Sequence, residues 1–460
     1  MRWLVSTLVA CLVACGSSQD EGPSDDAQDA SGVGGGGGVP AGTGGGAGQK
    51  DAGTGGKAGT GGGSGAGGAR NTGGSPGAGG SPGAGGSPGV GGSPGVGGSS
   101  GTGGLRDAGA TCTPNSALPA GAPALTPGTW VNISPAGVPF DQSATAFGQG
   151  ITRDPCAAGT LYVGVCGGDQ TAAKAGIYKT TNAGSTWARV GHLDEPINIV
   201  VDPRNPEHLY ASDGVRGGTM GFWVSTDGGE TFTMPQGYKD VGTKEGLYQY
   251  DVYDVAADPA DFNHVLVSFH GAWGWTDTKW NTSSGVLESK DGGTTWIVHA
   301  PMPGWGTGHA INFLGDSSTW LLGTQGAGMW RTTDSGTSWT KVTDNGIQHG
   351  GGAVYYTKAG VLFATGANQN MRSTDNGASW TLVGPGGGYN GIIGDGTRLY
   401  TAKCFGPSPF VTSLETDGVT WTDFSSQQFD QGVFRMDFDA VNGIVYSSQW
   451  GAGALALKIK

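Results

Sequence analysis

The sequence predicts an all-β fold in which one four-stranded unit is repeated seven times, and three observations predict it. A short phrase, Ser/Thr-x-Asp/Asn-x-Gly-x-x-Trp/Phe, occurs five times. A pair of apolar strands occurs seven times, and the units recur about every 40–55 residues, the length of a four-stranded propeller blade. A strand-like segment at residues 128–133 belongs to no unit that precedes it. Together they predict a seven-bladed β-propeller of four-stranded blades, closed by an N-terminal strand that completes the last blade.

The repeated phrase, called the box from here on, is a hairpin device. Its copies begin at Thr180, Ser225, Ser289, Thr332 and Ser373. A worn sixth copy keeps Gly418 and Trp421, with Thr416 where the acid is expected. Asp and Gly place polar contacts and a positive φ in a tight turn, and the aromatic residue that follows packs beneath the hairpin. The boxes therefore predict blade edges rather than ligand contacts.

The strand pairs give the order of the elements. They lie at residues 151–165, 199–212, 255–269, 311–324, 353–365, 392–402 and 436–448. Asp202-Pro203 and Asp258-Pro259 occupy equivalent turns, and prolines of this kind fix strand ends because they cannot sit within a ladder. After each pair we expect a third strand that leads into a box, and then a fourth.

The segment at residues 129–133 supplies the missing outer strand. It matches in pattern the strand that follows the first box, yet no blade precedes it. We expect it to complete a blade with strands near 435–439, 443–449 and 453–459. This closure joins the two ends of the domain and removes open sheet edges.

These boxes resemble the Asp-box (BNR) repeats of sialidase-like β-propellers, and the resemblance covers roughly residues 125–460. Xyloglucanase-type propellers share such boxes, and the resemblance implies catalytic acids in loops comparable to Cys166-Gly-Gly-Asp169. True sialidases need a three-arginine clamp and an Arg-Ile-Pro-like start, which this sequence lacks. The resemblance therefore implies a sialidase-like or xyloglucanase-like propeller that is not a classical sialidase.

The first part of the chain predicts export and anchoring. Residues 1–14 read as a signal peptide, since the apolar run is too short to span a bilayer. Leu12-Val13-Ala14-Cys15-Gly16 resembles a bacterial lipobox, with Cys15 as the lipidated residue. Because Gly16 follows Cys15, we expect delivery to the outer membrane, with the lipid-anchored protein facing the periplasm or the cell surface.

Residues 15–108 are predicted to be a disordered linker and residues 109–460 the propeller. The linker is dominated by Gly, Ser, Pro and Ala, and it cannot bury enough apolar surface to offset its ordering entropy. As a flexible coil it would reach roughly 55 Å.

The charge of the chain bears on its binding partners, and its cysteines bear on disulfide formation. The chain carries 24 Lys and Arg against 37 Asp and Glu, a net charge of −13, so a nucleic-acid partner is disfavoured. We expect a monomer that needs no cofactor. Beyond Cys15, topology favours a disulfide between Cys112 and Cys156, while Cys166 and Cys404 are left open as a pair or as thiols.

Candidate catalytic residues come from loops that follow second strands or precede first strands, which meet on one face of a propeller. They are Asp169, Asp213, Asp277, His270, His309 and His349. Two carboxylates could hydrolyse a glycosidic bond, and a histidine could transfer a proton near neutral pH. A divalent cation at His270, His309 and His349 is a further alternative.

Candidate substrate-binding residues lie in the same loops. They are Trp273, Trp275, Trp280, Trp305, Tyr248, Tyr250, Arg216, Gln325, Lys403 and Trp450. Exposed aromatic rings suit sugars, whose C–H faces stack on them. The alternative for the tryptophans is that they pack together as a small core beneath the loops.

The sequence thus predicts a membrane-anchored, extracytoplasmic, carbohydrate-active propeller. The first hypothesis is a glycoside hydrolase or lyase that acts on a polysaccharide. The alternative is a non-catalytic glycan- or protein-binding propeller of the cell envelope. The two differ in whether carboxylates, or a histidine with a cation, converge on the loop face.

Overall fold

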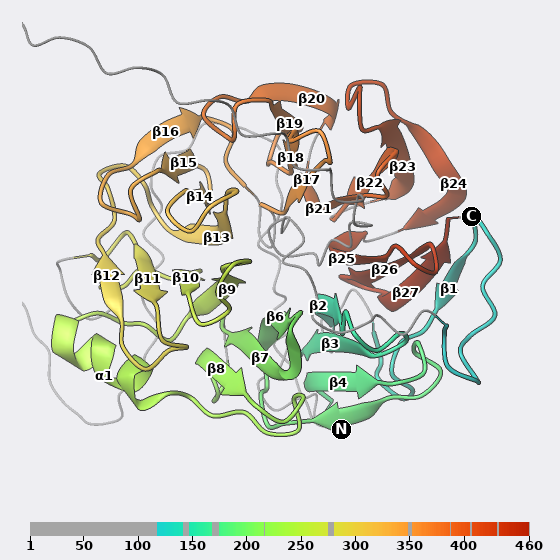
Figure 1. Cartoon of the computed structure of the whole chain (residues 1–460), viewed down its shortest axis with the longest axis horizontal. Helices are drawn as coiled ribbons and strands as arrows, with labels where there is room; N and C mark the ends of the chain where they lie inside the picture. The colour runs from blue at the N-terminus through green and yellow to red at the C-terminus, as the bar shows by residue number, and fades with distance from the viewer. Residues whose placement is uncertain are drawn as a thin grey trace, which may run out of the picture. The chain divides into compact units, whose positions relative to one another are not determined.

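The computed structural model describes residues 117–140, 147–167, 174–215, 217–274, 280–347, 352–386, 388–404, 407–429 and 432–459. In these residues, seven antiparallel sheets follow one another around a central axis (Figure 1). Each sheet is one blade, and its first strand lies nearest the centre. The all-β prediction, a seven-bladed propeller of four-stranded blades, is confirmed.

Apart from the N-terminal closing strand, the strands of each blade follow the chain from the centre of the ring to its rim. The innermost are β2 (Phe147–Arg153), β6 (Pro196–Asp202), β9 (Val252–Ala257), β13 (Gly308–Phe313), β17 (Val354–Tyr356), β21 (Tyr389–Gly394) and β25 (Val433–Asp439). The second strands are β3 (Leu161–Cys166), β7 (Asn205–Asp213), β10 (Val265–Phe269), β14 (Trp320–Thr324), β18 (Leu362–Ala364), β22 (Arg398–Lys403) and β26 (Ile444–Gln449). The third strands are β4 (Gly176–Thr180), β8 (Gly221–Ser225), β11 (Val286–Ser289), β15 (Gly328–Thr332), β19 (Gln369–Ser373), β23 (Ser408–Leu414) and β27 (Gly453–Lys458). The outer strands are β5 (Ala188–Val190), β12 (Ile297–His299), β16 (Thr340–Thr343), β20 (Thr381–Gly386), β24 (Thr422–Phe429) and β1 (Trp130–Asn132).

The N-terminal strand closes the ring as predicted. β1 pairs with β27 in an antiparallel register that places Trp130 opposite Leu457. Trp130 is buried and meets Phe410 of the neighbouring blade edge to face, with 4.9 Å between the ring centroids. The closing strand therefore contributes an outer strand and also core packing against blade six.

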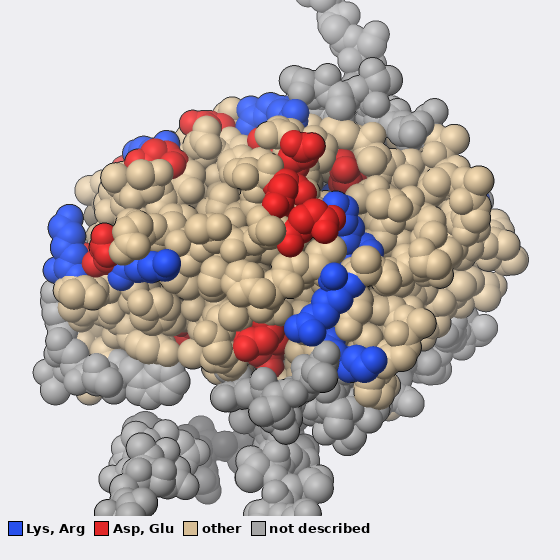
Figure 2. Space-filling view, turned by 90° about the horizontal axis from the view of Figure 1, so that it is seen from below, with Lys and Arg blue, Asp and Glu red and all other residues tan. Residues whose placement is uncertain are grey.

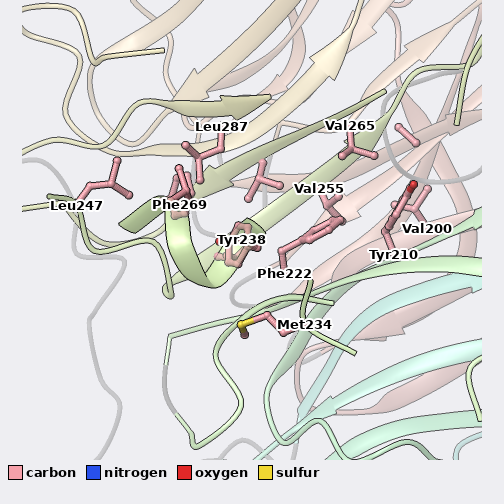
Figure 3. Packing of buried hydrophobic residues seen from close by; sticks show 14 of the residues in the cluster. Val200, Tyr210, Phe222, Met234, Tyr238, Leu247, Val255, Val265, Phe269 and Leu287 are labelled. Atoms are coloured by element: carbon pink, nitrogen blue, oxygen red, sulfur yellow. The ribbon is translucent and has the colours of Figure 1, made fainter. Parts of the chain in front are cut away.

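Blade two departs from the repeated pattern. In the part of the chain that is described, its sheet has three strands, and the fourth is reduced to a single bridge between Val224 and Thr233. The chain then forms α1 (Gln236–Glu245), which ends at Gly246 with a φ of 67°. Tyr238 of this helix is buried against Phe222 of β8 (Figure 3). The helix thus supplies the apolar cover that an outer strand gives elsewhere.

The five boxes form the same turn. In the second box the Ser225 hydroxyl donates to Asp227 over 2.8 Å, and it accepts the Gly229 backbone N–H over 2.9 Å. Gly229 has a φ of 87°, a left-handed conformation that glycine adopts without strain. The equivalent bonds recur at Thr180, Ser289, Thr332 and Ser373. These contacts confirm that the boxes are hairpin devices.

Box glycines also join each blade to the one before it. A Cβ on Gly229 would lie 3.0 Å from Tyr162 of blade one, and a Cβ on Gly418 would lie 2.2 Å from Phe363 of blade five. The same close approach joins Gly293 to Phe222. The small residue lets an aromatic ring of the preceding blade lie directly on the hairpin, so the boxes stabilise the ring as well as the turn.

One buried carboxylate ties four blades together at the centre. Asp254 of β9 accepts hydrogen bonds from the Asn198 side chain of blade two over 2.7 Å and from the Ile311 backbone of blade four over 3.2 Å. Arg435 of blade seven reaches the same carboxylate over 3.3 Å. Burial raises the pKa of Asp254, and Arg435 is the main group that opposes this. The charge pair crosses the central channel.

Charged side chains of both signs lie on the side of the molecule that Figure 2 shows. On the side shown in Figure 2, basic and acidic side chains form small adjacent groups separated by uncharged surface. Lys179 pairs with Glu230, and Arg204 pairs with Asp202. On this side the basic groups therefore lie next to acidic ones.

Three of the six cysteines lie within the described residues. Cys156 is disulfide-bonded, while Cys112, its predicted partner, and Cys15 lie outside the described residues. Cys166 and Cys404 are buried thiols. Within the described ranges, no helix has both the length and the apolar character needed to cross a bilayer.

Candidate functional site

The candidate site lies where second strands end and first strands begin, in blades two, three and four. β7 ends at Asp213, β10 ends just before His270, and β13 begins just before His309. Because propeller strands alternate in direction, these ends share one face.

His270 is paired with a carboxylate. Its Nδ1 lies 3.1 Å from Oδ2 of Asp251, the residue just before β9. The His270 side chain keeps 30% of its surface exposed, whereas that of Asp251 keeps 5%. The other oxygen of Asp251 accepts the Val215 backbone N–H over 2.7 Å. A buried, doubly held carboxylate therefore fixes the orientation of a partly exposed imidazole.

Two further rings complete this cluster. Tyr253 of β9 stacks on His270 with 5.4 Å between centroids and an interplanar angle of 29°. His309 lies 5.1 Å from His270 and 4.9 Å from Tyr253. His309 is fully buried, and its Nε2 lies 3.3 Å from the Thr307 hydroxyl. Of this cluster, His270 is the histidine that solvent reaches.

An acidic group lies beside it in blade two. Asp213 is fully buried and accepts the Glu195 backbone N–H over 3.0 Å. The Thr219 hydroxyl lies 3.1 Å from Asp213 and 2.6 Å from Asp194, so one hydroxyl joins two carboxylates. Burial raises the pKa of Asp213 well above its ordinary value, and the charges of Asp194 and Glu195 act in the same direction.

The Thr219 hydroxyl is the link between the two carboxylates. It accepts the Asp194 backbone N–H and lies within donating distance of both Asp194 and Asp213. The hydrogen bonds that Asp213 accepts from the Glu195 N–H and from Thr219 act to lower its pKa, and burial outweighs them. A buried carboxyl group with a raised pKa is the kind of group that can serve as an acid catalyst.

A strained loop connects the acidic group to His270. Val215 has a φ of 70°, which is uncommon for a β-branched residue, and its N–H is the one that holds Asp251. A Cβ on neighbouring Gly214 would lie 2.2 Å from the Val252 oxygen. The loop is therefore pressed onto blade three, and strain of this kind gathers at functional sites.

The structure corrects two of the predicted substrate-binding residues. Trp273 and Trp305 are fully buried. Trp273 packs on Phe269 and lies over Gly285, where a Cβ would be 2.7 Å from its ring. Trp305 meets Trp339 with 5.0 Å between centroids. Both fill gaps beneath the loops, because burying their large apolar surface outweighs presenting it to solvent.

Other predicted binding residues remain nearer the surface. Trp280 is half-buried against Trp273, and Tyr248 and Tyr250 meet edge to face over 5.7 Å. Trp450 is half-buried over Phe434, Lys403 is half-buried and Gln325 is exposed. Five further candidates lie outside the described residues: Asp169, Asp277, His349, Trp275 and Arg216.

The structure brings five residues to the site that are not among the candidates from the sequence: Asp194, Glu195, Thr219, Asp251 and Tyr253. Asp251 and Tyr253 belong to the segment Tyr-Gln-Tyr-Asp-Val-Tyr, whose alternation of polar and aromatic residues at the start of a first strand was the available signal. Within the described part of the chain, no three His, Cys, Asp or Glu side chains gather around a point suited to a metal ion.

Fold and site together define the class of the protein, a seven-bladed β-propeller with acidic and histidine side chains on one loop face. No family model matches the sequence. Over 103 residues, 20% of this chain, it is 35% identical to a xyloglucanase of Acetivibrio thermocellus, and the match covers 12% of that enzyme. A xyloglucanase of Hypocrea jecorina is 28% identical over 113 residues, 22% of this chain and 13% of that enzyme. The chain thus matches about an eighth of the length of these curated relatives.

Among solved structures, the extracellular domain of a hybrid two-component system from B. thetaiotaomicron superposes with a TM-score of 0.50 at 12% identity. The superposition covers 68% of this chain and 40% of that one. At this identity the likeness establishes the fold alone.

Proposed function

We propose that this protein is a lipid-anchored, extracytoplasmic propeller that hydrolyses a polysaccharide, with its chemistry on the loop face of blades two to four. The observation that carries the proposal is the convergence of two carboxylates, Asp194 and Asp213, on the Thr219 hydroxyl, where burial raises the pKa of Asp213. Glycoside hydrolysis needs one carboxyl group that donates a proton and a second group that is charged. The stretch of similarity to xyloglucanases supports the same reaction class.

The roles follow from exposure. Asp213, neutral and buried, serves as the proton reservoir. Half-buried Asp194 faces the substrate and exchanges protons with Asp213 through the Thr219 hydroxyl. Trp280, Tyr248 and Tyr250 are the described aromatic residues placed to stack on sugar rings. Asp169, Asp277 and His349 stay candidate catalytic residues, and Trp275 and Arg216 stay candidate binding residues, of the same loops.

A non-catalytic glycan-binding propeller is the second candidate, and one observation favours it. The Asp213 carboxylate has no exposed surface, so a substrate reaches it only through its neighbours. In this case the loop face retains a glycan without cleaving it. Lyase chemistry is a variant of the first candidate, in which His270 acts on a C–H proton.

The experiment is a panel of xyloglucan, xylan, mannan and homogalacturonan incubated with the wild-type protein, with products detected by mass spectrometry. We expect shortened products from at least one polysaccharide. Asp213→Asn should lower turnover by about 10²–10⁴-fold, as loss of an acid catalyst does. Asp227→Asn, in a box, is the matched control and should keep its rate. Retention on an immobilised glycan without any product would favour the binding candidate instead.

Anchoring is tested separately. If Cys15 carries the lipid, Cys15→Ser should move the protein from the membrane fraction to the soluble fraction. An unchanged membrane fraction with unchanged lipid labelling would contradict the anchor and leave the proposal for the loop face intact.

A further inference from the structure

We propose that Tyr238 and Gln249 are positioning residues for a sugar-binding subsite on the loop face, formed by the rings of Tyr248 and Tyr250. Helix α1, which takes the place of the outer strand in blade two, thereby sets how firmly the protein binds a glycan. This inference rests on the proposed function and deepens it, because it names what fixes the aromatic residues that stack on sugar. The ligand class is a sugar unit that presents a C–H face and hydroxyl groups.

The subsite belongs to the segment at residues 247–251, called the entry segment, which leads from α1 into β9. Gln249 and Asp251 are buried, whereas Tyr248 and Tyr250 are half-buried. This alternation is that of an extended chain, in which successive side chains point to opposite sides, so the two tyrosines share a side. Their rings stand at 73° with 5.7 Å between centroids, so a sugar that lies flat on one ring meets the edge of the other. Each tyrosine also offers a hydroxyl group for hydrogen bonds to the sugar.

Hydrogen bonds in both directions join the entry segment to α1. The Gln249 amide donates from Nε2 to the backbone carbonyls of Tyr238 and Lys239, over 3.2 Å each. The Tyr238 hydroxyl donates in return to the backbone carbonyl of Gln249. Both side chains are buried, and Gly242 leaves room for the amide, since a Cβ there would collide with it. The helix therefore holds the residue that lies between the two tyrosines of the subsite.

Tyr238 is itself held in place by blades two and three. Its ring lies beside Phe222 of blade two (Figure 3), with 5.6 Å between centroids. It also meets Trp296 of blade three, with 5.1 Å between centroids. A second support of the entry segment comes from the backbone, because the Tyr248 N–H donates to the Trp273 carbonyl over 2.6 Å. A platform held in this way loses little conformational entropy when a sugar binds, which favours affinity.

Tyr162 provides a matched comparison on the opposite face. It is buried like Tyr238, and its hydroxyl also donates to a backbone carbonyl, that of Gly228 in the box of blade two, over 2.8 Å. Replacing either tyrosine by phenylalanine removes one buried hydrogen bond and keeps the ring. The two changes should therefore cost similar stability, but only Tyr238→Phe loosens the entry segment.

The experiment measures the dissociation constant, Kd, by titration calorimetry with oligosaccharides of xyloglucan, xylan, mannan and homogalacturonan. All proteins carry Asp213→Asn, so that bound sugar is turned over slowly, and the thermal midpoint of each shows that it is folded. Tyr238→Phe and Gln249→Met should each raise Kd by about 3–10-fold, while Tyr162→Phe should leave Kd within about twofold. Tyr250→Ala, which removes a stacking ring, should raise Kd by about tenfold.

A positioning role is separated from a structural one by combining variants. If Tyr238 acts through the tyrosine pair, adding Tyr238→Phe to Tyr250→Ala should raise Kd by less than about twofold, because the platform is already lost. A further rise of about 3–10-fold in that background would contradict the assigned role, since the effect of Tyr238 would then not depend on the pair.

The outcomes distinguish this inference from the proposed hydrolase. If a sugar binds and folded Tyr238→Phe keeps Kd within about twofold, or Tyr162→Phe weakens binding as much, the inference is wrong and the hydrolase stands. If Tyr238→Phe weakens binding but the protein with Asp213 intact releases no product, the hydrolase fails and the subsite belongs to a binding propeller. If no oligosaccharide of the panel binds, the inference fails whatever the wild type cleaves.

Discussion

Glu288 of β11 shows at the scale of single residues how blade three uses buried charge for stability. His264, His299 and Lys290 all reach its carboxylate, over 2.9, 2.9 and 3.2 Å. Burial acts to raise the pKa of Glu288, but the hydrogen bonds from these partners outweigh it and bring the pKa to about 2. The pKa of His264 is raised, since its bonds to Asp258 and Glu288 outweigh the effect of its burial.

We expect Glu288→Gln to reduce the free energy of unfolding by about 3–5 kcal/mol, as removal of one partner from a buried pair does. The lowered pKa makes the contribution of Glu288 fully present above its ordinary pKa of 4.5 and lost as the pH falls through about 2. The raised pKa of His264 works the other way, with a contribution present below 6.5 and lost as the pH rises through the raised value. Urea unfolding of both proteins from pH 2 to 8 checks this. A difference that stays constant down to pH 2 would contradict it.

At the scale of elements, the glycine of each box has two roles. It allows the tight turn of the hairpin, and it lets the hairpin contact the preceding blade. Gly418 of the worn sixth box has a φ of 65° and lies against Phe363 of blade five. Gly360 has a φ of 79° but no atom within 4 Å of a Cβ position. A side chain at either position would strain the backbone to a similar degree. Only at Gly418 would it also collide with a neighbouring blade.

Gly418→Ala should destabilise the protein by about 1–3 kcal/mol more than Gly360→Ala, the usual cost of overpacking a core contact. The comparison removes the φ contribution, because both positions are left-handed. Thermal unfolding of the two variants measures the difference. Equal midpoints would mean that the blades do not rely on the box glycine for their contact.

At the scale of the whole molecule, the ring is closed twice, at its rim by β1 and at its centre by Asp254. Strand β1 covers the edge of β27, and Trp130 packs between blades seven and six. An open edge of this length would invite pairing with another chain. The closing strand therefore protects against association as well as unfolding.

Removing residues 1–135 should cost several hydrogen bonds and the burial of Trp130, the latter about 3–5 kcal/mol. Removing residues 1–108 leaves β1 in place and should give a folded monomer. Thermal midpoints and light scattering of the two proteins provide the measurement. If the longer deletion unfolds at the same temperature as the shorter one and stays monomeric, β1 does not close the ring.

The seven-bladed architecture could be predicted from the sequence because its repeated units leave repeated sequence patterns. Six boxes and an unmatched strand at residues 128–133 are local signals, and the structure places β1 where they predict it. They did not predict α1, because its segment contains two glycines and has no side-chain cap at its N-terminus. Its cause is tertiary, because Tyr238 fills the space against Phe222 that the absent outer strand leaves.

The candidate site was predicted less completely, because its geometry also depends on tertiary packing. Loop residues can be listed from the sequence, but their exposure depends on packing between blades. Trp273 and Trp305 are buried because glycine and aromatic neighbours receive them. Asp251 escaped notice because its importance comes from Val215 and His270, one from the blade before and one from its own blade's next strand.

The central claim is that the loop face of blades two to four handles carbohydrate, and hydrogen–deuterium exchange with xyloglucan oligosaccharides tests it most directly. Ligand addition should slow amide exchange at residues 191–195, 213–219, 248–252 and 269–274, and leave the boxes unchanged. This result is expected whether or not the bound sugar is cleaved. Protection confined to the boxes or to the opposite face, or no protection at saturating ligand, would contradict the account.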